Sequence, residues 1–239
     1  CLGVPLQIIP KEFQNLVFDK ASVPDFQRAQ PPRKQAMCKH MVDGRGYKGG
    51  EASAVKNQIL KFLGYKPHLD QAHLYWKNLL KPGDYVIDAT CGNGKDSLKL
   101  AELVPQGHVY AIDIQEVAIE KAKERIPHSN LSYLHQSHTV LPPGEFKLIV
   151  YNLGYLPGGN KELTTMTGTT LESLEKAAQL IVIGGALSVT CYPGHPEGLL
   201  EETAVRGWVE GLDSKNWLVF RHFWREKSPS LFYLVKLKN

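Results

Sequence analysis

From residue 68 onward, the chain of 239 residues alternates between short apolar runs and segments with apolar residues three or four positions apart. Apolar runs rich in β-branched residues predict strands, and the wider spacing predicts helices. The predicted strands are 84–90, 108–114, 131–137, 146–152, 185–192, 216–224 and 230–238. The predicted helices are 51–63, 68–80, 95–104, 115–126, 169–182 and 196–212, with Thr169 or Thr170 as the N-cap of the fifth.

Strands that alternate with helices predict an α/β fold with a doubly wound, seven-stranded, mostly parallel sheet. The last two predicted strands have only a short turn between them, around Ser228 and Pro229. We therefore expect an antiparallel hairpin at one edge of the sheet. Residues 1–50 are rich in proline, glycine and charge and show weak periodicity. The chain thus divides into a basic extension, 1–50, and a folded domain, 51–239.

The turn after the first predicted strand has the pattern D-x-x-x-G-x-G, in "VIDATCGNGKD" (86–96). Gly92 and Gly94 allow backbone N–H groups to approach a ligand at the start of the next helix. Open α/β sheets bind their ligands at this edge. A dinucleotide fingerprint needs a third glycine, where this chain has Ser97. Asp88 suits the ammonium of a methionine-like tail better than a pyrophosphate, which favours S-adenosylmethionine over a nicotinamide cofactor.

Polar residues after the second and third predicted strands fit an adenosine ligand. Asp113 can accept both ribose hydroxyl hydrogens, and Gln136, helped by Ser137, can accept from the adenine amino group. The alternatives are that Asp88 and Asp113 only cap neighbouring helices, and that two surface histidines merely surround a turn at 135–138. The predicted cofactor-binding residues are Asp88, Thr90, Cys91, Gly92, Asn93, Gly94, Asp96, Asp113, Ile114, Gln136, Ser137 and Asn152.

After the fourth predicted strand, Asn152 and Tyr155 have the spacing N-x-x-Y. This spacing resembles the N-P-P-Y element of methyltransferases that modify exocyclic amines. A neutral amine is already nucleophilic and a sulfonium methyl is already activated, so the protein mainly has to hold the two in line. The Asn152 oxygen and a backbone carbonyl can accept the amine's hydrogens, and Tyr155 can stack on a base. A plain glycine-rich turn is the alternative.

The loop after the fifth predicted strand, "YPGHPEG" (192–198), contains the candidate His195. An imidazole can accept a proton from a substrate ammonium near neutral pH, and the alternative is a turn residue between two prolines. The predicted catalytic residues are Asn152, Tyr155 and His195. The predicted substrate-binding residues are Leu153, Gly154, Tyr155, Tyr192 and His195.

Four segments together resemble one family over roughly residues 68–239. They are "DATCGNGKDSLKLAELV", "NLGYLPGGNKELTT", "TTLESLEKA" and "YPGHPEG", and the family is the YtqB-like rRNA methylases, the MnmM-type tRNA 5-aminomethyl-2-thiouridine methyltransferases. The resemblance implies methyl transfer from S-adenosylmethionine to the aminomethyl nitrogen of the wobble uridine of certain tRNAs. It implies cofactor contacts by Asp88, Gly92, Asn93, Gly94 and Asp113, and substrate contacts by Asn152, Gly154, Tyr155, Tyr192 and His195.

Two features depart from that family. Gln136, Ser137 and His138 stand where D-S-H is common, and the extension 1–50 is not part of the compact bacterial pattern. The extension holds eight Lys or Arg against four Asp or Glu, whereas the remainder holds twenty of each. A basic arm predicts a nucleic-acid contact, and a solvated tail or the remainder of a targeting peptide is the alternative. With the start at Cys1, we expect an organelle of a eukaryote, with the chloroplast as the candidate and the cytoplasm as the alternative.

Composition narrows the remaining classes. The four cysteines are far apart, and the nine histidines form no H-x-x-x-H pair on a helical pattern, so we expect no metal site. No apolar run approaches the roughly 18 residues of a bilayer span, so we expect no membrane contact. The expected partner is the anticodon region of tRNA, with a homodimer as an option. An rRNA methyltransferase, a nicotinamide-dependent oxidoreductase and a non-catalytic RNA-binding protein are the alternatives.

Overall fold

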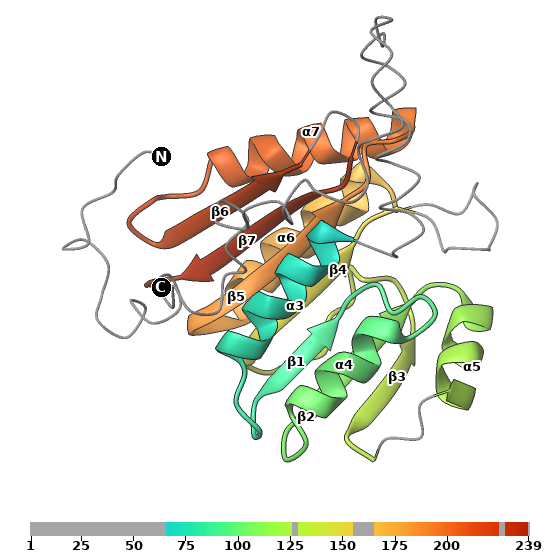
Figure 1. Cartoon of the computed structure of the whole chain (residues 1–239). Coiled ribbons are helices and arrows are strands. Elements are labelled where there is room, and N and C mark those ends of the chain that lie inside the picture. Colours follow the sequence, from blue (N-terminus) through green and yellow to red (C-terminus); the bar gives the residue numbers. More distant parts are fainter. Residues whose placement is uncertain (1–65, 126–128, 155–164, 225–227, 239) are drawn as a thin grey trace, which may run out of the picture. The chain divides into compact units, whose positions relative to one another are not determined.

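A computed structural model describes residues 66–125, 129–154, 165–224 and 228–238 (Figure 1). The chain divides into two compact units, 1–66 and 67–239, and every element described below belongs to the second. The basic extension, the predicted helix 51–63 and Tyr155 lie outside the described residues.

Seven strands of the described residues form one sheet with the order β3-β2-β1-β4-β5-β7-β6. Strands β1 to β5 pair in parallel, and β7 lies antiparallel between β5 and β6. The predicted sheet and its antiparallel C-terminal hairpin are therefore confirmed. The strands are β1 (Tyr85–Asp88), β2 (His108–Asp113), β3 (Leu131–His135), β4 (Phe146–Asn152), β5 (Ile181–Cys191), β6 (Trp217–Phe223) and β7 (Ser230–Lys236).

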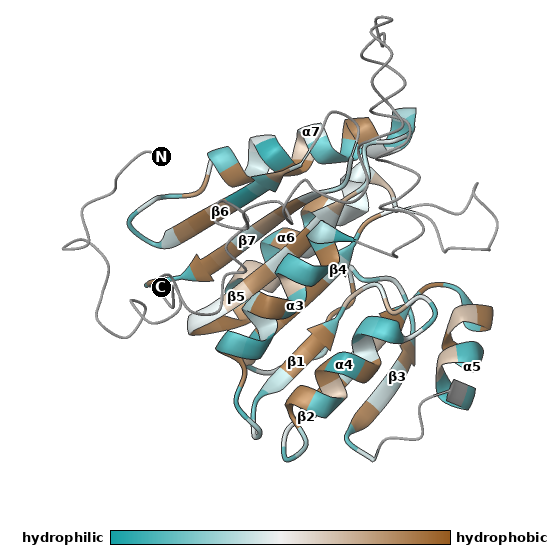
Figure 2. Ribbon diagram, viewed as in Figure 1, coloured by the Kyte–Doolittle hydropathy of each residue, from teal (hydrophilic) through white to brown (hydrophobic). Residues whose placement is uncertain are grey.

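Helices cover both faces of the sheet. They are α3 (Pro67–Leu79), α4 (Lys95–Leu103), α5 (Glu116–Arg125), α6 (Thr167–Leu180) and α7 (Pro196–Glu210). On one face, Trp76 of α3 donates from Nε1 to the Ser188 hydroxyl of β5 over 3.0 Å. Because side chains alternate along a strand, Leu187 and Val189 point to the opposite face. There they join Leu174 of α6 in the hydrophobic core, and the central strands are accordingly mostly apolar (Figure 2).

Two predictions around α6 were wrong. The helix begins at Thr167, and Met166 precedes it without a side-chain cap, so neither predicted threonine is the N-cap. Thr170 instead donates its hydroxyl hydrogen to Glu201 of α7 over 2.7 Å. The following strand, β5, begins at Ile181 and not at residue 185. The β-branched run 181–183 has a strand preference that outweighs its helical spacing.

The topology gathers polar residues at one edge of the sheet. Strands β1 to β5 are parallel, so their carboxyl ends lie at the same edge. Asp88, Asp113 and Asn152 are the last residues of β1, β2 and β4. The order of strands reverses between β1 and β4, and this is the position where open α/β sheets form their ligand crevice.

Candidate active site

Glycine conformations shape the loop between β1 and α4. Gly92 and Gly94 have φ values of 51° and 77°, in the left-handed region that favours glycine. The Gly92 N–H donates to Asp113 Oδ2 over 2.8 Å, and Gly94 is the N-cap of α4. The loop is therefore held against the end of β2, where the N-terminus of α4 favours negatively charged or polar ligand groups.

The Asp113 carboxylate binds the backbone of two loops and can still accept further hydrogen bonds. Its second oxygen, Oδ1, accepts from the Gln115 N–H over 2.9 Å. A carboxylate offers about four acceptor positions, so two backbone bonds leave room for ribose hydroxyls. The neighbouring Ile114 side chain is 66% exposed, which suits contact with a flat apolar ring. This set of donors, acceptors and apolar surface fits an adenosine group.

Asp88 is completely buried at the base of the loop. Its carboxyl accepts from the Ser97 hydroxyl over 2.6 Å and from the Thr90 N–H over 3.2 Å. Burial, reinforced by the negative charge of Asp96, raises the pKa of Asp88 to about 7. Ser97 stands where a dinucleotide fingerprint has its third glycine, and its hydroxyl supplies a hydrogen bond that the buried Asp88 carboxyl needs.

The remaining loop residues differ in what they offer a ligand. The Thr90 hydroxyl accepts from the Asn152 N–H over 2.7 Å and so joins the loop to the end of β4. The Cys91 side chain is 4% exposed, and burial raises the pKa of its thiol, so only its backbone is suited to ligand contact. Asn93 lies between the two glycines and is partly exposed.

The loop after β3 orients the predicted adenine contacts. The Gln136 side-chain NH₂ donates to the Val140 carbonyl over 2.6 Å. The amide oxygen therefore is the group of Gln136 that can accept from an adenine amino group. The Ser137 hydroxyl accepts from the Thr139 N–H over 3.2 Å and stabilises the turn itself.

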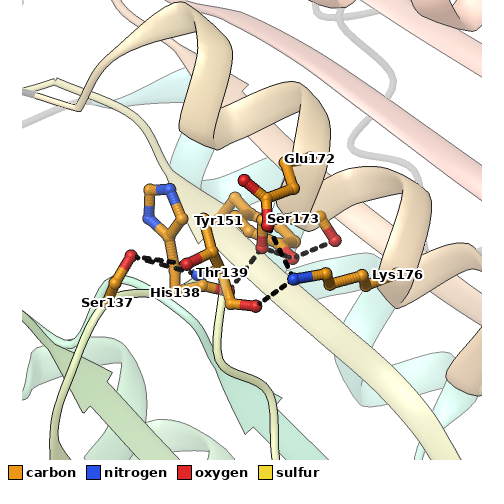
Figure 3. A network of polar contacts seen from close by, with 7 residues as sticks. All are labelled: Ser137, His138, Thr139, Tyr151, Glu172, Ser173 and Lys176. Atoms are coloured by element: carbon orange, nitrogen blue, oxygen red, sulfur yellow. Dashed lines mark hydrogen bonds and ion pairs between the residues drawn. The ribbon is translucent and has the colours of Figure 1, made fainter.

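A network of polar contacts fastens this loop to α6 (Figure 3). Ser173 donates its hydroxyl hydrogen to the His138 carbonyl over 2.6 Å, and Lys176 donates to the Thr139 carbonyl over 2.9 Å. The buried Tyr151 hydroxyl of β4 lies 2.7 Å from the Ser173 hydroxyl. The loop that carries Gln136 is thus fixed to the face of the sheet that α6 covers.

Asn152 occupies the centre of the edge and contacts α4. Its Nδ2 donates to Asp96 Oδ2 over 2.7 Å. The other oxygen of Asp96 lies 2.8 Å from His73 Nε2 of α3. His73 was not among the residues predicted from sequence, because nothing local to α3 marks a side chain whose partner lies 23 residues away.

The two residues after Asn152 form a bend. Leu153 is 1% exposed and belongs to the hydrophobic core, so its side chain is not available to a substrate and only its carbonyl is suited to that role. Gly154 has a φ of 132°. Its N–H donates to the Thr165 hydroxyl over 2.8 Å, and its carbonyl accepts from the Thr165 N–H over 3.0 Å.

Glu201 of α7 is connected to this bend through the Thr165 hydroxyl, which accepts from Gly154 and donates to Glu201. Its carboxyl oxygens accept from the hydroxyls of Thr165 and Thr170 over 2.8 and 2.7 Å. The residue is 2% exposed, and burial raises the pKa of its carboxyl. The sequence did carry a signal, because Glu201 shares helical spacing with the buried Val205 and Val209. An acidic residue on the apolar side of a helix needs buried donors.

Tyr192 lies beside Gly154 of the bend, and His195 follows Tyr192 in the same loop. His195 is the N-cap of α7, and its Nδ1 accepts from the Gly198 N–H over 3.1 Å. A neutral ring that accepts at Nδ1 carries its proton on Nε2. A second proton on Nδ1 would therefore break the hydrogen bond from the Gly198 N–H that caps α7. The half-buried Tyr192 meets the His68 ring edge-on at 5.5 Å.

The described residues offer neither a cluster of metal ligands nor a helix that could span a membrane. No group of three or more His, Cys, Asp or Glu among those residues could hold a metal ion. Within the same ranges, no helix is long and apolar enough to cross a bilayer.

The fold and the site define the class of S-adenosylmethionine-dependent methyltransferases with a Rossmann-like sheet. Residues 109–237 match the family described as "Putative rRNA methylase". The chain belongs to this family.

Known proteins similar to this chain support the assignment. The chloroplastic tRNA (mnm(5)s(2)U34)-methyltransferase of Arabidopsis thaliana is 36% identical over 202 residues, which cover 74% of each chain. The crystal structure of a "putative rRNA-methylase" from Clostridium thermocellum has 34% identity and a TM-score of 0.70, and it covers 72% of this chain and 99% of its own. A Streptococcus mutans "putative methyltransferase" in complex with SAH (S-adenosylhomocysteine) has 28% identity, a TM-score of 0.66 and the same coverage.

The pKa of Asp88 predicts pH-dependent cofactor binding. The carboxyl is protonated below about pH 7 and ionised above it. A ligand ammonium placed near Asp88 favours the ionised form. Binding should therefore release a proton, and the affinity for S-adenosylhomocysteine should rise as the pH increases from 6 to 8. Titration calorimetry in buffers of different ionisation enthalpy measures both quantities. Equal affinity at both pH values, or no proton release, contradicts a contact between Asp88 and the ammonium.

Removing the Glu201 carboxyl should loosen the bend at Gly154. Glu201→Leu leaves the buried Thr170 hydroxyl and the partly buried Thr165 hydroxyl without their acceptor, which should lower the free energy of unfolding by about 1–3 kcal/mol. Glu201→Gln keeps an acceptor oxygen and should cost less. Urea unfolding measures stability, and hydrogen exchange of the Gly154 amide reports on the bend. Glu210→Gln, an exposed change on the same helix, is the control. The role given to Glu201 is wrong if its leucine variant behaves like this control.

Proposed function

We propose that this protein transfers a methyl group from S-adenosylmethionine to the 5-aminomethyl nitrogen of the wobble (2-thio)uridine of tRNA. The name of the Arabidopsis relative supports this substrate. The observation that carries the proposal is the amide of Asn152 at the carboxyl end of β4. Its NH₂ group is engaged by Asp96, and its oxygen is the acceptor left to receive hydrogens from an amine.

The chain's own residues fit the methyl donor. S-adenosylmethionine supplies a methyl group that its sulfonium has already activated. Asp113 would hold the ribose hydroxyls, and the Gln136 amide oxygen would accept from the adenine amino group. The loop with Gly92 and Gly94 would bring backbone close to the ligand, and Asp88, buried at the base of this loop, would attract the ammonium through its negative charge. The S-adenosylhomocysteine in the Streptococcus mutans structure supports this cofactor.

The substrate side needs positioning more than acid–base strength. The Asn152 oxygen and the Leu153 carbonyl would accept the hydrogens of the amine, which directs its lone pair toward the methyl group. Tyr155 as a stacking surface and Tyr192 as a wall of the pocket remain predictions. An amine that binds in its protonated form must first lose a proton. His195 could accept this proton at Nδ1 only by losing the hydrogen bond from the Gly198 N–H that caps α7.

The family description favours a second candidate, an RNA methyltransferase that acts on rRNA. Both substrates offer an amine on a base, so the chemistry of Asn152 does not separate them. The nicotinamide-dependent alternative is not retained, because Ser97 is committed to Asp88 and the loop lacks the third glycine.

The proposed partner is the anticodon region of tRNA, and the proposed compartment is the chloroplast, in line with the name of the Arabidopsis relative. The basic residues of 1–50 are proposed as a contact to the RNA phosphates. A homodimer remains part of this proposal.

Incubating the enzyme and S-adenosylmethionine with undermodified tRNA should produce a methylated aminomethyluridine, detected by mass spectrometry of nucleosides. Ribosomal RNA from the same cells is the second substrate. Asn152→Ala should lower the transfer rate by about 100-fold or more, because the amine loses its acceptor, while the affinity for S-adenosylhomocysteine stays similar. Asn216→Ala, before β6 at the opposite edge of the sheet, is the control. Methylation of rRNA alone, or a fully active Asn152→Ala enzyme, refutes the proposal.

Neutralising the basic extension should weaken tRNA binding. In a triple variant with Arg33, Lys34 and Lys39 changed to glutamine, each lost phosphate contact should flatten the slope of log K against log salt by about 0.7–0.9. Filter binding across a range of salt concentrations measures the slope. The affinity for S-adenosylhomocysteine should not change. A slope equal to that of the wild type shows that these residues do not contact the RNA.

A further inference from the structure

A single carboxylate links three elements at the centre of the site. Asp96 of α4 meets Asn152 of β4 through Oδ2 and His73 of α3 through Oδ1, over 2.7 and 2.8 Å. The side chains of Asp96 and His73 are only 16% and 23% exposed. Both oxygens of this acidic side chain are therefore used within the protein.

The chemistry of a carboxylate fixes the direction of both bonds. An ionised carboxylate only accepts hydrogen bonds, so each neighbour must present an N–H to it. Asn152 can do so only with its NH₂ group, which settles the orientation of an amide whose two ends are otherwise alike in shape. His73 must likewise carry a hydrogen on Nε2.

The pair of Asp96 and His73 is itself firmly held. The His73 ring packs against the Trp76 ring with a centroid distance of 4.7 Å. Trp76 is 1% exposed and donates to Ser188 of β5. A continuous series of contacts therefore joins the Asn152 amide, through Asp96, His73 and Trp76, to the buried Ser188 of β5.

We infer that Asp96, held by His73, is a positioning residue that turns the Asn152 oxygen toward the substrate amine. The inference rests on the proposed function. In the opposite orientation, Asn152 would present N–H groups to an amine whose own hydrogens need an acceptor, and the lone pair would be drawn away from the methyl group. The role differs from the cofactor contact predicted for Asp96 from sequence, because it acts through Asn152.

Two substitutions at Asp96 separate orientation from charge. Asp96→Asn keeps an oxygen that can accept from Asn152 and an NH₂ group that can donate to the other tautomer of His73. Asp96→Leu removes both bonds. We expect kcat to fall by about 100-fold in Asp96→Leu and by less than about 10-fold in Asp96→Asn. His73→Phe, which removes one donor to Asp96, should lie between them. At about pH 8.5, where the Asp88 carboxyl is ionised in every variant, the affinity for S-adenosylhomocysteine should stay within about threefold throughout, because the proposed effect acts on the amine.

A second measurement does not depend on activity. In the wild type, the Asn152 side-chain NH₂ should give an amide NMR signal shifted by its bond to a carboxylate and slow to exchange with water. Its absence from the Asn152→Ala spectrum assigns the signal. The slow exchange should be lost in Asp96→Leu and retained in Asp96→Asn, because the amide oxygen of the asparagine still accepts the hydrogen bond. Asp70→Leu, an exposed change on α3 in a groove between α3 and α4 that His73 also lines, should alter neither the signal nor kcat.

The outcomes distinguish this inference from the proposed function. An Asp96→Leu enzyme that keeps the wild-type kcat, or that keeps the wild-type signal of the Asn152 NH₂ group, overturns the inference. Asp96→Asn as impaired as Asp96→Leu shows that the charge matters, and a large loss of cofactor affinity shows a cofactor ligand; either result overturns it as well. If the wild type methylates no tRNA while the Asn152 signal behaves as described, the proposed function fails and the positioning of the amide stands.

Discussion

The pairing of β1 with β4 is the constraint on which the site depends. These strands are neighbours in the sheet, although 57 residues lie between the end of β1 at Asp88 and the start of β4 at Phe146. Asp88 and Asn152 are at the carboxyl ends of the two strands, and the register sets Asp88 opposite Val150. At this reversal of strand order, the glycine-rich loop and the end of β4 come within hydrogen-bond distance. The Thr90 hydroxyl then accepts from the backbone N–H of Asn152, and the Asp96 carboxylate accepts from the side-chain NH₂ of Asn152. Without this pairing, neither the loop nor the amide would have a fixed position.

Buried carboxyl groups give the edge of the sheet its rigidity. Asp88 lies at the base of the glycine-rich loop between β1 and α4, and Glu201 is bound to the bend at Gly154 through Thr165. Each carboxyl accepts hydrogen bonds from hydroxyl groups. Burial raises the pKa of both, which is the expected result when a charge leaves water without a cation as its partner. Such groups are costly unless every oxygen finds a donor. The loops around them therefore have little freedom to rearrange, and this suits a reaction that relies on alignment.

Polar side chains in this site are oriented by what their neighbours can accept. Asp96 can only accept, and so determines which end of the Asn152 amide remains for an amine. Gln136 follows the same logic, because its NH₂ group is taken by the Val140 carbonyl. His195 is a cap whose Nδ1 already accepts a backbone N–H. In the proposed function, the oxygens left as acceptors on Asn152 and Gln136 would face an amine and an adenine amino group, which both need acceptors.

The sequence by itself determined the class of fold and the composition of the cofactor loop, because both depend on patterns that are local in the chain. Strand and helix periods predicted the parallel sheet and its hairpin, and Gly92 and Gly94 marked a turn with left-handed conformations. Only the tertiary structure decided which side chains meet. His73, Asp96 and Asn152 come from three elements, and Glu201 reaches Thr165 from 36 residues away. Thr170 was predicted as a possible helix cap, but its hydroxyl binds Glu201 of α7. Leu153 was predicted to contact substrate, but its side chain is buried in the core. Partners of this kind are set by strand order and helix packing, which a local pattern does not encode.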